Sequence, residues 1–507
     1  MRHLPQCRST QLLEMETNSA DPRKAQYLRD MAQIMWFRRD LRVGDNPALM
    51  QAISRASSQT GSKLAAVYVL GPRTWAGMSA VQKHYLLASL AKLNESLNGK
   101  LIVKYGDAAQ VIPVLAQEIG ASAVHIAAAH TPHAIARDAQ VAEALQTAGV
   151  EFVVTGSAYA VAPGRVTKAD GTFYKVYTPF YKNWLAHGWR APVSAPTSWP
   201  TWVDTISSDP LPELPPIDSI DLPMAGETAA LARWELFKKS SLADYDENRN
   251  RPDLDGTSNL STALRFGEVH PRTLLADLGE EAGEITYRKE IAWREFYADI
   301  LFQRPDTVDG YYNKTYKAMA YDSGEVAEQR FTSWINGQTG YPLVDAGMRQ
   351  LRSTGWMHNR VRMVVASFLI KDLHLEWTRG AQHFAQWLTD FDPASNSHGW
   401  QWTAGCGTDA SPYYRVFNPI GQGIKFDPNG DYIRKYIPEL RHIPGVAAHE
   451  PWLHREGHVN GYPKPIVDHA AERLVALERL ANLPKGEAQI AAPSQNIDQA
   501  KLIQSFE

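Results

Sequence analysis

Residues 340–380 read GYPLVDAGMRQLRSTGWMHNRVRMVVASFLIKDLHLEWTRG, and residues 388–419 read LTDFDPASNSHGWQWTAGCGTDASPYYRVFNP. Three features of this stretch are unusual for an ordinary helical core. Arginines interrupt an apolar helical run, and two carboxylates, Asp390 and Asp392, flank a single residue. Tryptophan also recurs, at Trp356, Trp377, Trp387, Trp400 and Trp402. These features make the stretch the first candidate for a functional centre.

Helical spacing places Asn359, Arg362 and Met363 on one face, because they lie three and four residues apart. The apolar residues expected to pack around them are Val361, Val364, Val365, Phe368 and Leu369. An arginine held there needs a carboxylate partner, since an unpaired buried charge is very costly. Asp390 and Asp392 are the nearest candidates. The pattern alone leaves open a purely structural ion pair, and the tryptophans could be ordinary core.

Three segments of this stretch resemble one protein family. They are GWMHNRVRM (residues 355–363), DFDPASNSHGWQW (390–402) and GTDASPYYRVFNP (407–419). They are similar to the flavin-binding domain of the photolyase/cryptochrome family, above all to class I photolyases. The resemblance runs from about Met35 to about Leu440. It implies light-dependent repair of cyclobutane pyrimidine dimers in DNA, by electron transfer from excited, reduced FAD to a flipped-out dimer.

Composition sets broad limits on the chain. Its 507 residues exceed what one hydrophobic core holds, which predicts two domains. No apolar run approaches the roughly 18 residues of a membrane span, so no membrane association is expected. Two cysteines, Cys7 and Cys406, indicate a reducing, cytoplasmic environment. The net charge of −3 means that any DNA site must be a local patch. Nothing indicates an obligate interface, so we expect a monomer.

Residues 1–31 show no trustworthy pattern, and we interpret them as a disordered extension or a mis-assigned start. Apolar runs then occur at Ala32–Phe37, Leu64–Leu70, Leu101–Tyr105, Ala123–Ala128 and Phe152–Thr155. The helical stretches between them include Ser79–Leu97, Ala108–Ile119 and Ala134–Ala148. This alternation predicts a Rossmann-like α/β domain over residues 32–160, with a parallel sheet covered by helices on both faces.

The pattern changes twice downstream. Residues 161–230 are rich in proline, which predicts an extended interdomain linker that carries no chemistry. Residues 231–485 are helical in pattern, and the resemblance makes them an all-α domain for FAD binding and catalysis. Residues 486–507 are expected to be a flexible tail.

MWFRRDLRVGDNPAL, residues 35–49, resembles the opening of the photolyase antenna domain, which holds a second, light-harvesting chromophore in many members. Folate-type members carry Asn-Glu where this chain has His133 and Ala134. The resemblance therefore implies a deazaflavin antenna, or none, over folate. His130 and His133 are spaced like a metal-binding pair, but no further ligands cluster nearby in the sequence. We interpret them as surface histidines and expect no metal.

A Gly-Thr-Ser turn at residues 256–258 offers N–H groups and hydroxyls before a helix, which alone is typical of an ordinary N-cap. In the family the matching turn grips the flavin diphosphate. The resemblance also implies that Arg362 pairs with Asp390 to steer the flavin ring, and that Asn396 faces the flavin N5 edge. The implied FAD-binding residues are Tyr245, Thr257, Ser258, Asn259, Leu260, Ser261, Arg362, Asp390, Phe391, Asp392 and Asn396.

Glu290, Trp293 and Arg294 fall on one helix face. An amphipathic surface would give this pattern, as would a pocket wall that stacks a base and hydrogen-bonds its edge. The resemblance implies the second, with Glu290, Asn359 and Asn396 as the catalytic residues. The implied DNA- and lesion-binding residues are Arg249, Glu290, Trp293, Arg294, Tyr297, Asn359, Arg360, Met363, Trp402, Arg415, Gln422 and Lys425.

Basic residues are concentrated around this region. They include Arg349, Arg352, Arg360, Arg362, Lys371, Arg379, Arg415, Lys425, Arg434 and Lys435. A charge run is usually a solvated face, but beside an expected aromatic pocket it favours phosphate binding.

The resemblance also implies a chain of aromatic residues that carries electrons to the flavin. Trp400 and Trp377 match its two inner members. At the third, surface position this chain has Tyr321 where relatives have tryptophan. Tyr321 could substitute, Trp334 could be recruited, or the chain could be shorter.

Three alternatives to dimer repair remain at this point. A cryptochrome-like blue-light sensor would use the same flavin fold, but Asn396, Glu290, Trp293 and Trp402 argue against it. A (6-4) photoproduct photolyase is disfavoured by Asn359 followed by arginine. A tryptophan-rich helical protein without a cofactor is the third.

Overall fold

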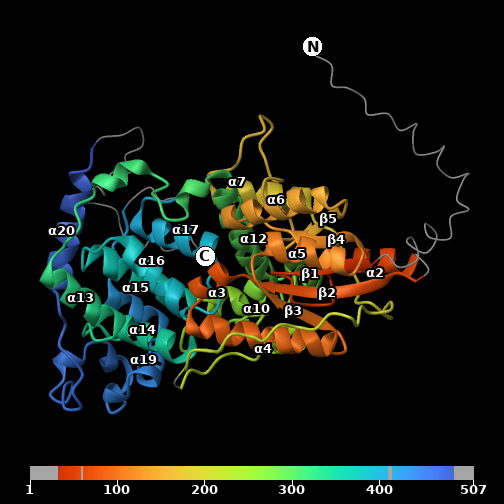
Figure 1. Ribbon diagram of the computed structural model, residues 1–507. Coiled ribbons are helices and arrows are strands. Elements are labelled where there is room, and N and C mark those ends of the chain that lie inside the picture. The colour runs from red at the N-terminus through yellow and green to blue at the C-terminus, as the bar shows by residue number, and fades with distance from the viewer. Residues whose placement is uncertain (1–31, 59–60, 218, 409–413, 485–507) are drawn as a thin grey trace, which may run out of the picture.

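The computed structural model describes residues 32–58, 61–217, 219–408 and 414–484. The interpretations of residues 1–31 and 486–507 lie outside the described residues. A five-stranded parallel sheet, in the order β3-β2-β1-β4-β5, is the centre of an N-terminal α/β domain (Figure 1). Its strands are β1 (Ala32–Phe37), β2 (Lys63–Leu70), β3 (Leu101–Tyr105), β4 (Ala121–Ala128) and β5 (Glu151–Ser157).

Helices cover both faces of this sheet, which confirms the fold class. They are α2 (Pro47–Ser58), α3 (Pro72–Gly77), α4 (Ala80–Ser96), α5 (Ala108–Glu118) and α6 (Pro132–Thr147). Successive residues of β1 point to opposite faces. Ile34 and Trp36 pack with α5 and α6, whereas Met35 and Phe37 pack with α2 and α4. The strand order reverses between β1 and β4, which makes the crevice at their carboxyl ends the switch point of the sheet.

The proline-rich segment contains helix α7 (Tyr177–His187) before it becomes irregular. Trp202 then forms an isolated bridge with Leu64 of β2, so the segment runs along the sheet. The ring of Tyr177 stacks on Trp293, with centroids 3.6 Å apart and planes 7° apart. The expectation of an extended linker is therefore wrong for residues 177–187, which are helical, and whether the segment carries chemistry stays a prediction.

Helices form the second domain (Figure 1). They are α8 (Glu227–Ser240), α9 (Tyr245–Asn248), α10 (Ser261–Phe266), α11 (Pro271–Ala276), α12 (Ala282–Gln303), α13 (Glu325–Ile335), α14 (Pro342–Thr354), α15 (Asn359–Lys371), α16 (Trp377–Trp387), α17 (Pro393–Ala404), α18 (Pro419–Phe426), α19 (Asp431–Tyr436) and α20 (His469–Ala481). Short 3₁₀ helices span Pro305–Thr307, Lys314–Ala318, Pro438–Leu440, Gly445–His449 and Pro451–Leu453. Their main core cluster includes Trp334, Val361, Phe368, Trp377 and Trp400.

Side-chain caps set where the helices of this domain begin. His358 Nδ1 accepts from the N–H of Arg360 at 3.2 Å at the start of α15. Asn418 Oδ1 accepts from the N–H groups of Ile420 and Gly421 at the start of α18. Caps satisfy N–H groups that a helix end would leave unpaired. The polar residues of the sequence motifs are thereby fixed at helix starts.

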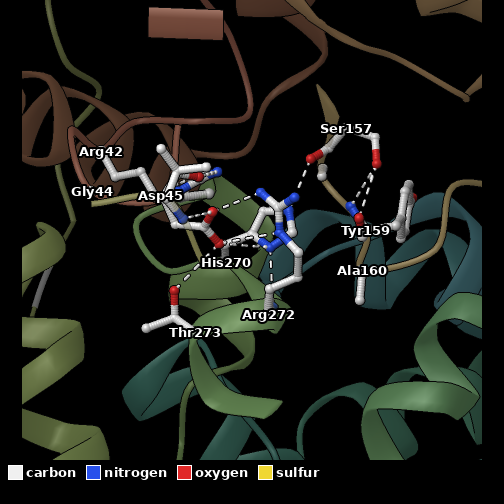
Figure 2. A network of polar contacts seen from close by, with 12 residues as sticks. Arg42, Gly44, Asp45, Ser157, Tyr159, Ala160, His270, Arg272 and Thr273 are labelled. Carbon is white, nitrogen blue, oxygen red and sulfur yellow. Dashed lines mark hydrogen bonds and ion pairs between the residues drawn. The ribbon is translucent and has the colours of Figure 1, made fainter. Parts of the chain in front are cut away.

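A buried polar network joins the two domains (Figure 2). Asp45 Oδ1, just before α2, binds Arg272 Nη2 of α11 at 2.7 Å, and both side chains are at most 7% exposed. Burial, with Arg42 and Arg272, holds the pKa of His270 well below its usual value, so this ring is neutral. Its Nδ1 accepts from the Arg272 N–H at 3.1 Å, and its Nε2 lies 2.9 Å from the Ser157 carbonyl oxygen. The 3.3 Å approach of His270 to Asp45 is therefore no ion pair, and Arg272 compensates the buried carboxylate.

Asp45→Asn should lower the free energy of unfolding by about 3–5 kcal/mol, because Arg272 would become an unpaired buried charge. Urea unfolding followed by tryptophan fluorescence measures the change. Asp204→Asn is the matched control, since Asp204 is 70% exposed and lies 3.9 Å from Lys63. An exposed pair contributes at most about 1 kcal/mol. Small, equal changes in the two variants would contradict the role given to Asp45.

Candidate functional site

Both carboxylates of the segment between α16 and α17 are bound by arginines. Arg362 Nη2 of α15 donates to Asp390 Oδ2 at 2.7 Å, and Arg362 Nε donates to the Met357 carbonyl at 2.7 Å. The predicted Arg362–Asp390 ion pair is therefore confirmed. Asp390 Oδ1 is buried and has no hydrogen-bond partner among the described residues. Such an acceptor costs free energy unless a ligand donates to it.

Asp392 both caps a helix and pairs with the α/β domain. Its Oδ1 accepts from the N–H groups of Ala394 and Ser395 at 3.1 Å, which begins α17. Its Oδ2 accepts from Arg39 Nη2 at 2.8 Å. Burial opposes ionisation of Asp392, but Arg39 and Arg294 outweigh it and hold the pKa of this carboxyl well below its usual range. The Asp392 carboxylate therefore has hydrogen-bond partners in both domains, Arg39 in the α/β domain and the start of α17 in the helical domain.

Positive charge exceeds negative charge around Asp392. Arg39, Arg265 and Arg294 all act on this one carboxylate. Burial and the neighbouring Arg39 lower the pKa of Arg265 to about 9. Arg294, predicted to contact DNA, instead lies 4.7 Å over the ring of Tyr159 at the domain junction. These half-buried cations suit an anionic group such as a phosphate.

The predicted phosphate-binding turn, residues 257–261, leads into α10. Arg233 of α8 donates to the carbonyls of Thr257 and Ser258 at 3.1 and 3.0 Å, which holds the turn against that helix. Thr257 Oγ1 donates to Asn259 Oδ1 at 3.0 Å, and Asn259 has φ of +52°. Asparagine tolerates this left-handed conformation better than most residues. The turn is therefore a preformed loop.

The hydroxyl groups of Ser258 and Ser261 accept hydrogen bonds, so each can still donate its own proton to a ligand. Ser258 Oγ accepts from Tyr287 Oη at 2.9 Å, and Ser261 Oγ accepts from Trp356 Nε1 at 3.1 Å. A hydroxyl that accepts retains its own O–H for donation to an anion. Tyr245 packs nearby, edge to face with Tyr287 at a centroid distance of 5.3 Å.

Glu290 and Trp293, one turn apart on α12, form the predicted pocket wall. Glu290 Oε1 pairs with Arg249 Nη1 at 2.7 Å, and both side chains are about a quarter exposed. Tyr177 covers one face of Trp293, and Tyr297 lies beside it with ring centroids 5.5 Å apart. These contacts hold the carboxylate and the indole in place before any substrate binds.

Cations gather beside this wall. Arg360 of α15 donates to Asn250 Oδ1 at 2.8 and 3.1 Å. Burial, Arg249 and Arg415 lower the pKa of Arg360 to about 10, and Glu290 opposes that shift. Arg249 pairs with Glu290, and Arg360 lies near both Arg249 and Arg415, so these basic groups outnumber the one glutamate.

Helix α18 borders the same cluster. Arg360 and Lys425 lie 4.5 and 5.2 Å over the ring of Phe426. Gln422 Oε1, one turn before Phe426, is buried without a hydrogen-bond partner in the described ranges. Asn359 is exposed at the start of α15, and Met363 and Trp402 are half-buried. Helices α12 and α15, which bear most of these residues, both pack on α17.

Much of the remaining basic run is neutralised by acidic residues. The partners are Glu439 for Arg349, Glu328 for Arg379 and Asp431 for Arg434. Lys371 is 3% exposed, and burial lowers its pKa to about 7. The expectation that the whole run binds phosphates is therefore wrong for the buried Lys371, and it stays a prediction for the three paired arginines.

Trp400 lies among the predicted electron-transfer residues. Its ring packs against Gly380 of α16, where a Cβ atom would come within 2.1 Å of Trp400 Cη2. Trp377 lies one turn before Gly380. Trp334 meets Trp400 edge to face with centroids 6.2 Å apart, but Trp334 is 0% exposed and so is no surface member.

Tyr321 is connected to Trp377 through Tyr311, a residue that the sequence motifs did not indicate. Tyr321 is hydrogen-bonded to Tyr311, and the ring of Tyr311 meets Trp377 edge to face at 5.8 Å. Tyr311 belongs to the segment DGYYNKTY, residues 309–316, which has no periodicity that would mark it. Asn396, expected to face the flavin, donates to the Ala381 carbonyl at 3.1 Å.

The part of the chain that the structure describes contains neither a metal-binding cluster nor a membrane-spanning helix. Across residues 32–58, 61–217, 219–408 and 414–484, no group of three or more histidine, cysteine or acidic side chains could hold a metal ion. In the same ranges, no helix is long and apolar enough to cross a membrane.

An α/β domain with a parallel sheet, joined to a helical domain with paired buried aspartates and a hydroxyl-bearing turn, defines the photolyase/cryptochrome class of flavoproteins. Family models described as DNA photolyase and as the FAD-binding domain of DNA photolyase match residues 33–198 and 287–482. The chain belongs to the DNA photolyase family and is an enzyme of the photolyase type.

Individual relatives agree with this assignment. A deoxyribodipyrimidine photo-lyase of Synechococcus is 39% identical, over 86% of this chain and 93% of the relative. The crystal structure of a class III photolyase from Agrobacterium tumefaciens has a TM-score of 0.81 at 36% identity, covering 90% of this chain and 98% of that one. A Synechocystis cryptochrome has a TM-score of 0.79 at 30% identity, covering 88% and 98%.

His398, on α17, is a buried neutral histidine in this site. It stacks on Tyr297 at a centroid distance of 5.7 Å, and its Nε2 lies 3.3 Å from Thr307 Oγ1. Burial, helped by Arg304, lowers the pKa of His398 to about 4. In the unfolded chain the pKa of a histidine side chain is higher, about 6.5. The unfolded state therefore binds more protons, and stability is lost as the pH falls from about 6.5 toward 4.

His398→Gln should reduce the loss of unfolding free energy between about pH 7.5 and about pH 5.5 by roughly 1.4 kcal/mol, because this proton uptake disappears. Urea unfolding at the two pH values measures the loss. His187→Gln, at an exposed position, is the control and should keep the wild-type pH dependence. The same pH dependence in His398→Gln as in wild type would rule out the assigned contribution.

Proposed function

We propose that this chain uses light to split cyclobutane pyrimidine dimers in DNA. The arrangement on α12 supports this proposal most strongly, because the carboxylate of Glu290 and the indole of Trp293 lie beside a cluster of arginines. Glu290 can hydrogen-bond the polar edges of two pyrimidines, and Trp293 can stack on them. Arg249 and Arg360 can bind the flanking phosphates. The name of the Synechococcus relative supports the same substrate.

We infer that FAD is the cofactor, because three features of the site fit it. Asp390 Oδ1 needs a donor, the hydroxyls of Ser258 and Ser261 can donate to a diphosphate, and the arginines around Asp392 can balance its charge. Tyr245 would pack on the cofactor. When bound, a reduced flavin absorbs light and supplies a single electron.

The residues of this chain would position the lesion. Extrusion of the target from the duplex is a general property of photolyases, and we adopt it for this chain. Glu290, held by Arg249, orients the dimer, and Trp293 presents the face that Tyr177 does not cover. The dimer opens after it gains one electron and then returns that electron, so the repair needs neither a nucleophile nor an acid–base pair.

An antenna chromophore would bind in the α/β domain, and we propose deazaflavin or none, over folate. The switch point between β1 and β4 is where sheets of this type bind ligands. Arg38 and Arg137 lie 5.0 and 5.1 Å from the centroid of the Trp36 ring there. Trp36 Nε1 is buried without a partner among the described residues. The absorption spectrum of the purified protein distinguishes the two outcomes.

Repair of a thymine-dimer oligonucleotide by the reduced protein tests the proposal. Light should restore intact thymines, and darkness should not. Trp293→Ala should weaken dimer binding by about 1–3 kcal/mol, the contribution of one stacked base. Glu290→Gln should weaken it through loss of the charged acceptor. Glu280→Gln is the control, because Glu280 is 83% exposed and its ion pair is with Arg288, not with Glu290 or Trp293.

The rival functions give different results. Flavin absorbance without any repair would favour a light sensor, and repair of a (6-4) photoproduct in place of the dimer would favour that photolyase class. A colourless protein would favour a helical protein without a cofactor. Each of these results would refute dimer repair.

A further inference from the structure

A tyrosine–glutamate pair lies beyond Trp377, outside the predicted flavin and lesion sites. Tyr311 Oη donates to Glu376 Oε1 at 2.8 Å. The Tyr311 ring meets Trp377 edge to face, with centroids 5.8 Å apart and planes at 86°. Tyr311 is 7% exposed and Trp377 is 1% exposed. A phenol therefore contacts a buried indole on one side and hydrogen-bonds a carboxylate on the other.

We propose that Tyr311 is a proton-coupled electron donor to Trp377, with Glu376 as the proton acceptor. The inference rests on the proposed function, because a light-excited, oxidised flavin is the oxidant that would act through Trp400 and Trp377. In this step one electron moves from the phenol of Tyr311 to the Trp377 radical cation. The phenolic proton moves to the Glu376 carboxylate. The products are a neutral tyrosyl radical, a neutral indole and a neutral carboxylic acid, so charge and atoms balance.

Burial explains why the proton must leave with the electron. A phenol that lost only its electron would be a cation in the protein interior, where an unpaired charge is costly. Burial also raises the pKa of Tyr311 well above its usual value, so the phenolate is not formed beforehand. The 2.8 Å hydrogen bond to Glu376 is within the reach of direct proton transfer.

Trp334, an aromatic neighbour of Trp400, lacks such a base at its indole N–H. Trp334 Nε1 donates to the Val365 carbonyl at 3.0 Å, and a carbonyl does not take up a proton at ordinary pH. Trp334 is also fully buried, so an oxidised Trp334 would stay charged in the interior. The oxidising equivalent is therefore stabilised on the Tyr311 side, because that side can release a proton.

Tyr321 adds a second phenol to the pair. It is half-buried and hydrogen-bonded to Tyr311. Because Tyr311 donates its own proton to Glu376, its oxygen can accept a hydrogen bond from the Tyr321 hydroxyl through a lone pair. Tyr321 thus supports the Tyr311 oxygen after its proton has left toward Glu376.

Flash illumination of the oxidised, FAD-loaded protein without DNA tests the inference, with transient absorption and freeze-quench EPR as readouts. In the wild type a neutral tyrosyl radical should form as the tryptophan radical cation decays, and more slowly in deuterated buffer. Tyr311→Phe keeps the ring and should abolish the tyrosyl signal. Glu376→Gln keeps an acceptor but removes the base, and should slow radical formation at least about tenfold. Tyr316→Phe, at a tyrosine 5% exposed, is the control and should behave as wild type.

Several results would overturn the inference. They are the absence of a tyrosyl radical in the wild type, an undiminished signal in Tyr311→Phe, a signal lost only in Tyr321→Phe, or a wild-type rate in Glu376→Gln. The experiment uses no DNA, so it is independent of dimer repair. A chemically reduced protein that repairs dimers, but whose oxidised form shows no tyrosyl radical, would refute this inference alone. A protein that forms the radical at Tyr311 but repairs nothing would refute only the proposed function.

Discussion

Two buried carboxylates separated by one residue impose the constraint on which the helical domain depends. Asp390 and Asp392 cannot remain ionised in the interior without cations, because a buried pair that loses one partner is destabilised by about 3–5 kcal/mol. Arg362 of α15 supplies the cation for Asp390, and Arg39 of the α/β domain supplies it for Asp392. The segment is therefore satisfied only when α15, the start of α17 and the α/β domain are assembled together.

This constraint links stability to function. Helix α17 begins at Asp392 and carries Trp400 and Trp402, and α12, with Glu290 and Trp293, packs against it. The buried acceptor Asp390 Oδ1 has no donor among the described residues, and Arg39, Arg265 and Arg294 act on the single carboxylate of Asp392. Both features cost free energy in the protein alone. A cofactor that satisfied them would bind to a site already arranged for it, and preorganisation of this kind favours affinity.

Local sequence predicts much of this fold but few of its long-range contacts. All five apolar runs form strands, and the central strand β1 is an almost continuous apolar run because it is buried on both faces of the parallel sheet. The Arg362–Asp390 pair could be predicted only in part, since helix spacing left Asp390 and Asp392 as candidate partners and the family resemblance selected Asp390. The Arg39–Asp392 pair could not, because 353 positions separate its members and no local pattern distinguishes Arg39 from other arginines. For the same reason the sequence did not reveal that Tyr177 stacks on Trp293, or that remote acids neutralise much of the basic run.

A crystal structure of the FAD-loaded protein tests the central claim most directly, namely that the paired aspartates between α16 and α17 frame a flavin site. The account predicts that the cofactor donates a hydrogen bond to Asp390 Oδ1 while the Arg362–Asp390 pair stays intact. It also predicts that the cofactor phosphates lie near the Thr257–Ser261 turn. A cofactor bound elsewhere, with Asp390 Oδ1 still without a donor, would contradict it.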